Sequence, residues 1–184
     1  LGLMVKSSVE LEAGNNQYQL IANADNYRLA LRNNGPMLVI KDSGAEGADQ
    51  WGALVVDAPN TLNSRELNFI VATYKTQGST RIITLYVNGQ VVAEESFRGD
   101  EDARIHYPQP NQEITLGKGN LTGWKRAFFG AMDNVFILNT PLNQNQIQDM
   151  ANNYEEFITN TIHFEDFTDI SDIELFGRVM VREM

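Results

Sequence analysis

The chain has 184 residues, of which 42% are hydrophobic and 21% charged, which is enough for one sandwich-sized domain with a full core. Its net charge of −10 argues against nucleic acid and anionic membranes as partners, because phosphate contacts need clustered Lys and Arg. The absence of cysteine excludes disulfides, a thiolate nucleophile and Cys-ligated zinc. No apolar run is long enough for membrane insertion. The start, LGLMVKSSVE, has no signal-peptide pattern and predicts a strand, so we expect the chain to be part of a longer protein.

A first hairpin is predicted in the segment YRLALRNNGPMLVIKD, which spans residues 27–42. Leu29 and Leu31 before the run Asn33-Asn34-Gly35-Pro36, and Leu38 and Ile40 after it, mark alternate apolar positions. Asn and Gly tolerate positive φ, and Pro cannot join a central ladder, so the run predicts a turn.

A second hairpin is predicted in RIITLYVNGQVVAEESF, where Asn88-Gly89 separates two runs of β-branched and aromatic residues. This pattern is typical of a type I′ turn. Further strands are predicted at LGLMVKSS, QYQLIA, WGALVV, LNFIVATY, ITLG and FFGAMDNVFIL. Turn residues separate the strands at a spacing that favours a sandwich over βαβ units.

One short helix is predicted in TPLNQNQIQDMANNY. Pro141 ends the preceding strand, and Asn143 followed by Gln146 forms a capping-box pattern. An apolar stripe is expected to pack on the sandwich edge, and it consists of Leu142, Ile147, Met150 and Tyr154.

The run LNFIVATYKTQGSTRIITLYVNGQVVAEESF resembles the central signature of laminin G-like and pentraxin-like jelly-roll domains. In that signature a strand ending in Thr-Tyr is followed by a loop, then L-Y-V-N-G and the return strand. ITLGKGN resembles the next element, and FFGAMDNVFILNTPLNQNQIQDMANNY resembles the closing strand and helix. These elements follow the order of the family over residues 1–154.

The resemblance implies an all-β fold, namely a concanavalin A-like jelly-roll β-sandwich of two antiparallel sheets with one short helix. Residues 1–154 would form a laminin G-like domain. Residues 155–184 would form a C-terminal extension that supplies an edge strand or begins a neighbouring domain. The resemblance also implies an extracellular, cell-surface or virion-surface location, with other domains flanking this one.

A sugar site is predicted in the loops. Carbohydrate sites usually set an aromatic face against a sugar ring, while polar side chains hold the hydroxyls. Trp124 lies in the polar segment GNLTGWKRAFF, and Tyr107 in RIHYPQP would form a second platform. Asn120, Lys125 and Arg126 are nearby polar partners. The alternative is that Trp124 packs over an edge of the sandwich.

A single structural calcium ion is a second expectation, because many members of this superfamily bind Ca²⁺ and Ca²⁺ takes six to eight oxygen ligands. The candidate ligands are Asp133 and Asn134 on the closing strand, Asp25 and Asn26 in a hairpin loop, and Asp100, Glu101 and Asp102 in RGDEDAR. Where pentraxins carry an acidic run after the I-x-L-G strand, this chain has Lys118, Gly119 and Asn120. A pentraxin-type double calcium site is therefore not expected. Alternatively, Asp133 accepts hydrogen bonds from loop amides.

No catalytic centre is predicted. Relatives that hydrolyse glycans use two carboxylates on one face of a strand. Asp172 and Glu174 come nearest to this pattern, but they lack the leading Glu and lie outside the region of resemblance. Glu94 and Glu95 are adjacent, so a strand would point them to opposite faces. The sequence also lacks the nucleophile elbow G-x-S-x-G.

The sequence therefore predicts a non-catalytic extracellular recognition module that binds a glycan or protein ligand through the loops of a β-sandwich. Two alternatives stay open. The domain could be a structural or assembly element of a larger surface or virion protein, or a glycan hydrolase of the same fold. The function rests on the resemblance, since a fold by itself does not decide it.

Overall fold

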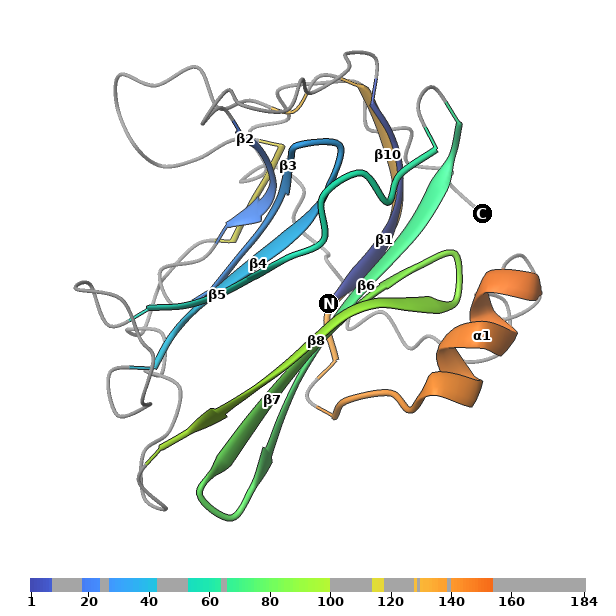
Figure 1. Cartoon of the computed structure of the whole chain (residues 1–184). Coiled ribbons are helices and arrows are strands. Elements are labelled where there is room, and N and C mark those ends of the chain that lie inside the picture. Colours follow the sequence, from blue (N-terminus) through green and yellow to red (C-terminus); the bar gives the residue numbers. More distant parts are fainter. Residues whose placement is uncertain are drawn as a thin grey trace.

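Two five-stranded antiparallel sheets pack face to face, and one helix lies against the outside of one of them (Figure 1). The computed structural model describes residues 1–7, 18–23, 27–42, 53–63, 66–99, 114–117, 128, 130–138 and 140–153. All strand statements below concern these residues. In this part of the chain, no helix is long and apolar enough to cross a membrane.

The strands that the sequence predicts are confirmed, and they divide between the two sheets. Sheet A has the order β10 (Gly130–Phe136), β1 (Gly2–Ser7), β6 (Asn68–Gln77), β7 (Thr80–Val87) and β8 (Gln90–Arg98). Sheet B has the order β5 (Ala53–Asp57), β4 (Gly35–Lys41), β3 (Tyr27–Arg32), β2 (Tyr18–Asn23) and β9 (Thr115–Leu116). Neighbours in each sheet are often distant in sequence, as in a jelly roll.

The core lies between the sheets because alternate residues of each strand point inward. From sheet A it receives Ile70 of β6 and Ile83 of β7, and from sheet B it receives Leu29 of β3 and Leu54 of β5, all 0% exposed. Each such side chain contributes roughly 1.5–3 kcal/mol through burial. The alternation along each strand therefore determines which side chains point into the core and which point to the outer face of the sheet.

The turn Asn88-Gly89 forms as predicted, with φ of 51° at Asn88 and 80° at Gly89. These positive φ values at both turn positions are those of a type I′ turn. Gly89 has a second role, because a Cβ there would approach Ala151 to 3.1 Å and Gln148 to 3.2 Å. The hairpin is therefore in close contact with the helix.

The first hairpin differs from its prediction at Pro36. Asn33 and Asn34 form the turn with φ of 50° and 54°, but β4 begins at Gly35 and includes Pro36, although β4 lies between β3 and β5. The ladder tolerates Pro36 because its carbonyl accepts a bond from the Ala58 amide at 2.9 Å. Pro36 has no N–H that could donate to the Ala58 carbonyl. The Ala58 carbonyl instead accepts a hydrogen bond from the Thr61 hydroxyl at 2.7 Å.

The helix α1 (Gln144–Asn152) begins with the predicted capping box: Asn143 Oδ1 accepts from the Gln146 amide at 3.0 Å, and Gln146 Oε1 accepts from the Asn143 amide at 2.9 Å. Of its predicted apolar stripe, Ile147 and Met150 are buried, at 0% and 1% exposure, Leu142 is half-buried, and Tyr154 lies outside the described residues. The stripe packs on the outer face of sheet A rather than at the predicted edge, against Phe69, Val71, Tyr86 and Phe136. These large outward-facing side chains supply the apolar surface that the helix needs.

Candidate functional site

Most of the predicted site residues lie outside the described part of the chain. This holds for the sugar-site residues Trp124, Tyr107, Asn120, Lys125 and Arg126, and for the calcium candidates Asp25, Asp100 and Asp102. The sugar site and the calcium site therefore stay predictions. The described residues provide other features that bear on function.

Asp133 and Asn134 lie on β10, at the edge of sheet A. Asp133 is exposed and stands opposite Met4, on the face where α1 packs. Asn134 adopts a φ of 53° where the register shifts between Gly2 and Met4. Within the described ranges, no three His, Asp or Glu side chains come close enough to hold a metal ion. Calcium at this bulge would need further oxygen ligands from elsewhere in the chain.

A buried ion pair joins the two sheets. Asp42, directly after β4, accepts a bond from Arg81 Nε at 3.1 Å, and their side chains are 0% and 1% exposed. Asp42 also accepts a bond from the Tyr74 hydroxyl at 2.9 Å. Burial and this hydrogen bond raise the pKa of Tyr74 above its ordinary value of 10.0. Because Asp42 and Arg81 have almost no exposed surface, we interpret the group as a link between the sheets rather than a ligand site.

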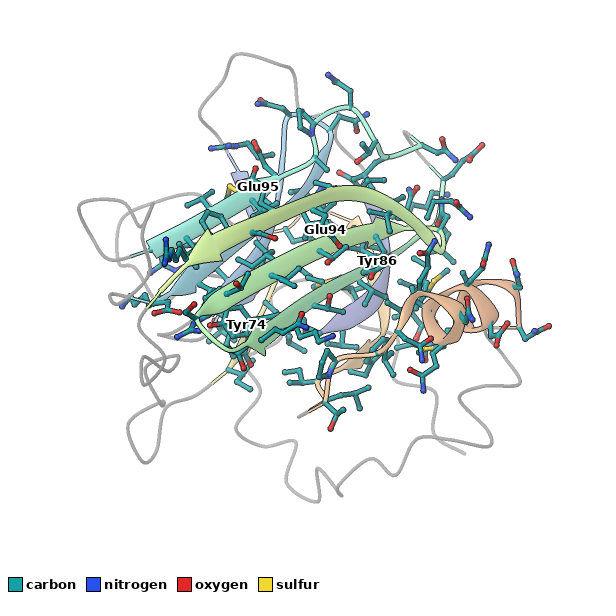
Figure 2. The ribbon with its side chains drawn as sticks, turned by 60° about the horizontal axis from the view of Figure 1, so that its bottom comes forward. Tyr74, Tyr86, Glu94 and Glu95 are labelled. Carbon is teal, nitrogen blue, oxygen red and sulfur yellow. The ribbon has the colours of Figure 1, made fainter. Side chains whose placement is uncertain are left out.

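The two adjacent glutamates of β8 point in opposite directions, as the sequence predicts (Figure 2). Glu94 stands opposite Thr84, and its carboxylate accepts the Thr84 hydroxyl at 3.0 Å on the outer face of sheet A. Glu95 stands opposite the core residue Ile83 and so belongs to the inner face. A carboxylate pair acting on one glycosidic bond cannot be built from these two residues.

A pocket of about 260 Å³ lies where β1 starts beside β6 and where the chain leaves β10. The described residues that line it are mainly apolar and include no charged side chain, and their polar side-chain groups are hydroxyls such as those of Tyr27 and Thr73. A sugar carries many hydroxyls, and a site that binds it needs several polar groups placed around the ring. The pocket is therefore better suited to an apolar side chain than to a sugar.

The outer face of sheet B is the side of that sheet that points away from the core, and α1 lies on the opposite side of the sandwich (Figure 1). The strand alternation places these described side chains of β3, β4 and β5 on this sheet B outer face: Arg28, Ala30, Arg32, Met37, Val39, Lys41, Ala53, Val55 and Asp57. Ala30 and Met37 form its buried centre. The other side chains are candidates for ligand contact.

One ion pair crosses this face. Arg32 on β3 binds Asp57 on β5, and each side chain is 31% exposed. Because Arg32 stands opposite Gly35 and Asp57 opposite Met37, the pair crosses β4 between these two residues. Gly35 permits close packing here, since a Cβ would collide with the Ala58 carbonyl. The pair neutralises one positive and one negative charge.

Two positive charges on the face are not neutralised in this way. Arg28 is half-buried and stands opposite Val39, which in turn stands opposite Val55. Lys41 lies two residues beyond Val39 on β4 and is exposed. Among the described residues, neither cation has a carboxylate partner. An acidic chain thus carries a local cationic spot on an otherwise apolar part of sheet B.

Sequence reasoning missed Arg28 and Lys41. A signal was nevertheless present in YRLALR, because arginines at positions 28 and 32 alternate with Leu29 and Leu31. Once the leucines are assigned to the core, the arginines must share the opposite face. What the alternation does not show is that Asp57 pairs with Arg32, while Arg28 has no carboxylate partner in the described part of the chain.

Solved structures with the same fold include sugar-binding and receptor-binding domains. The CBM40 module of the Ruminococcus gnavus IT-sialidase, bound to α2,3 sialyllactose, has a TM-score of 0.57 and 14% identity, covering 82% of this chain and 80% of that one. A second structure of the module has a TM-score of 0.56 and 16% identity, with the same coverage. The receptor-binding domain of botulinum neurotoxin mosaic serotype C/D has a TM-score of 0.50 and 16% identity, covering 83% of this chain and 35% of that one. At these identities the likeness is one of fold.

The family assignment comes from the sequence. A comparison with curated proteins gives no match. Residues 9–148, which make up most of the chain, match the Laminin_G_3 family, and the matched region includes both hairpins and the start of α1. The chain therefore belongs to the concanavalin A-like lectin/glucanases superfamily, as a member of the Laminin_G_3 family.

Proposed function

We propose that this chain is a non-catalytic carbohydrate-binding module that works outside the cell or at a cell or virion surface. The observation that carries the proposal is the shared fold with the CBM40 module bound to α2,3 sialyllactose, which extends over 82% of the chain. A broad family membership alone would leave catalysis and structural roles equally open.

The architecture supports this role because the two sheets are linked and their outer faces differ. The buried ion pair of Asp42 and Arg81 holds the sheets together, and α1 covers part of the outer face of sheet A. In the described part of the chain, the sheet B outer face then remains for a ligand. A preorganised surface of this kind loses little conformational entropy on binding, which favours recognition of flexible oligosaccharides.

The loop around Trp124 is a second part of the proposal. There Trp124 and Tyr107 would stack on sugar rings, with Asn120, Lys125 and Arg126 binding hydroxyls. Trp124→Ala should weaken glycan binding several-fold or more, whereas Trp124→Phe, which keeps an aromatic face, should retain most of it. Equal binding by both variants and the unmodified chain would exclude Trp124 from the site.

A glycan array tests the function itself. The purified chain is screened in the presence of calcium and again with a chelator, and thermal denaturation under the same conditions reports whether calcium stabilises the fold. Glycan binding in either condition supports the proposal. Binding and stability that both fall with the chelator would support one structural calcium ion. Absence of binding in both conditions would contradict the proposed function.

The non-catalytic part of the proposal has its own test. Glu94 and Glu95 face opposite sides of sheet A, and the remaining carboxylate pair, Asp172 and Glu174, lies outside the described residues. Glycans that bind on the array are incubated with the chain, and released reducing ends are measured. Turnover that disappears in Asp172→Asn and Glu174→Gln would show a hydrolase instead.

An assembly role is a second candidate, and an exposed apolar segment favours it. Ile137 and Leu138 are 44% and 43% exposed beside the 260 Å³ pocket, where an apolar side chain of a partner or a neighbouring domain would fit. Deleting residues 155–184 and measuring mass by analytical ultracentrifugation separates the roles. A binding module keeps its ligand and mass, whereas an assembly element loses its oligomer or its fold.

A further inference from the structure

We propose that the ligand is an acidic sugar and that Arg28, assisted by Lys41, binds its carboxylate on the sheet B outer face. This inference rests on the proposed glycan binding and narrows it to one chemical class and one surface. It does not require the loop around Trp124.

Arg28 is held in a position that suits a ligand-binding arginine. Its strand neighbour Leu29 is 0% exposed in the core, so the backbone of β3 is fixed at this point. The side chain is half-buried opposite Val39, and in the described part of the chain no carboxylate or carbonyl occupies its guanidinium. A guanidinium offers two parallel N–H groups that match the two oxygens of a carboxylate.

Lys41 adds a second positive charge close to Arg28. It is diagonal to Arg28 across the β3–β4 ladder, a relation that separates Cα atoms by about 7–8 Å. The third cation of the face, Arg32, is already paired with Asp57. Counting the described residues alone, the charge around Val39 is therefore positive, on a chain whose net charge is −10. Charge complementarity therefore favours binding of an anionic ligand beside Arg28 and Lys41. The negative net charge disfavours binding of such a ligand to the rest of the surface.

The surroundings of Arg28 favour a sugar over a simple anion. Val39 is half-buried and Val55 is 37% exposed, and the two stand side by side across β4 and β5. They offer an apolar surface next to the guanidinium, which suits the C–H face of a pyranose ring carrying a carboxylate. A free inorganic anion would gain nothing from this surface, and we therefore commit to a carboxylated sugar.

The test compares three probes on the whole 184-residue chain: α2,3-sialyllactose, its methyl ester and lactose. Binding is followed by titration in ¹H–¹⁵N NMR spectra, which detects weak complexes. The ester keeps every atom of the sugar framework but removes the charge. We expect the acid to bind and the ester and lactose to bind at least tenfold more weakly.

Charge-matched variants locate the site. Arg28→Gln should weaken binding of the acid roughly 10- to 100-fold, because it removes a charge-assisted bond. Arg28→Lys should give an intermediate loss of affinity, because lysine keeps the positive charge but lacks the two parallel N–H groups of the guanidinium. Lys41→Gln should cost about two- to fivefold. Arg98→Gln and Lys75→Gln remove the same charges from exposed positions on the outer face of sheet A, and these controls should bind normally.

Each outcome has a defined meaning. Preferential binding of the acid, lost in Arg28→Gln and retained in Arg98→Gln, supports the inference. Equal binding of acid and ester, unaffected by Arg28→Gln, overturns it while leaving glycan binding intact. Equal loss in all charge variants shows a diffuse electrostatic effect and overturns the assignment to Arg28. Failure of every glycan on the array to bind contradicts the proposed function and this inference together. Thermal denaturation of each variant confirms that it is folded.

Discussion

The buried ion pair between Asp42 and Arg81 makes a strong prediction about stability. Arg81→Met removes the positive charge beside a carboxylate that is 0% exposed and leaves that carboxylate in the interior. Breaking one partner of a buried pair in this way costs about 3–5 kcal/mol. Since a domain of this size is stabilised by only about 5–15 kcal/mol, the variant should lose a large part of its stability.

The chain supplies a matched control for this experiment. Arg32 and Asp57 also join two strands through an ion pair, but both side chains are 31% exposed. Because solvent screens such pairs, Arg32→Met should cost no more than about 1 kcal/mol. The free energies of unfolding are measured by urea titration, followed by circular dichroism, and a constant slope against urea shows that the unfolded states are comparable.

A double variant completes the test. Arg81→Met combined with Asp42→Leu replaces both charges, and the combined loss should be clearly smaller than the sum of the two single losses, by at least about 1 kcal/mol. If Arg81→Met costs less than about 1 kcal/mol, like the exposed pair, then the two sheets do not depend on this link and the reasoning is refuted. Additive single losses would refute the coupling between the two residues.

Three further predictions concern single positions. Gly35→Ala places a methyl group against the Ala58 carbonyl and should cost about 1–3 kcal/mol, measured by thermal denaturation; an unchanged midpoint would contradict this packing. Asn143→Ala removes the N-cap of α1 and should cost about 1 kcal/mol, whereas Asn143→Ser should recover most of it. Tyr74→Phe should cost about 1 kcal/mol at pH 7 through the lost hydrogen bond. Since the folded-state pKa of Tyr74 is raised, its contribution is complete below pH 10 and is lost as the pH rises further. Urea midpoints between pH 9 and 11 should therefore fall more steeply for the unmodified chain than for Tyr74→Phe, and parallel curves would refute this.

Features that depend on a few neighbouring residues could be predicted from the sequence. The Asn88-Gly89 turn follows from the backbone preferences of two residues, and the capping box from the spacing of Asn143 and Gln146. The order of such local features was sufficient to indicate the family and the sandwich. Short-range preferences therefore determine the elements and their sequence along the chain.

Features that depend on distant residues could not be predicted. Arg81 lies in an apolar strand, and its partner Asp42 is 39 positions away, so the buried pair has no local signature. The stripe of α1 shows that the helix must pack, but the surface that receives it consists of residues from β6, β7 and β10. The sequence predicts a turn at Pro36, yet Pro36 lies in β4. The Thr61 hydroxyl donates to the Ala58 carbonyl in place of the N–H that Pro36 lacks, and Thr61 is too distant in sequence to be recognised as this donor.

The exposed position of Ser96 on β8 has a practical consequence. Exposed Ser96 stands opposite Ile82 on β7, on the outer face of sheet A, and so lies on the side of the sandwich away from the sheet B outer face. The chain contains no cysteine, so a cysteine introduced at Ser96 would be the one thiol in the molecule. A tether attached there would orient every copy in the same way on a sensor or bead, with Arg28 and Lys41 directed toward the sample.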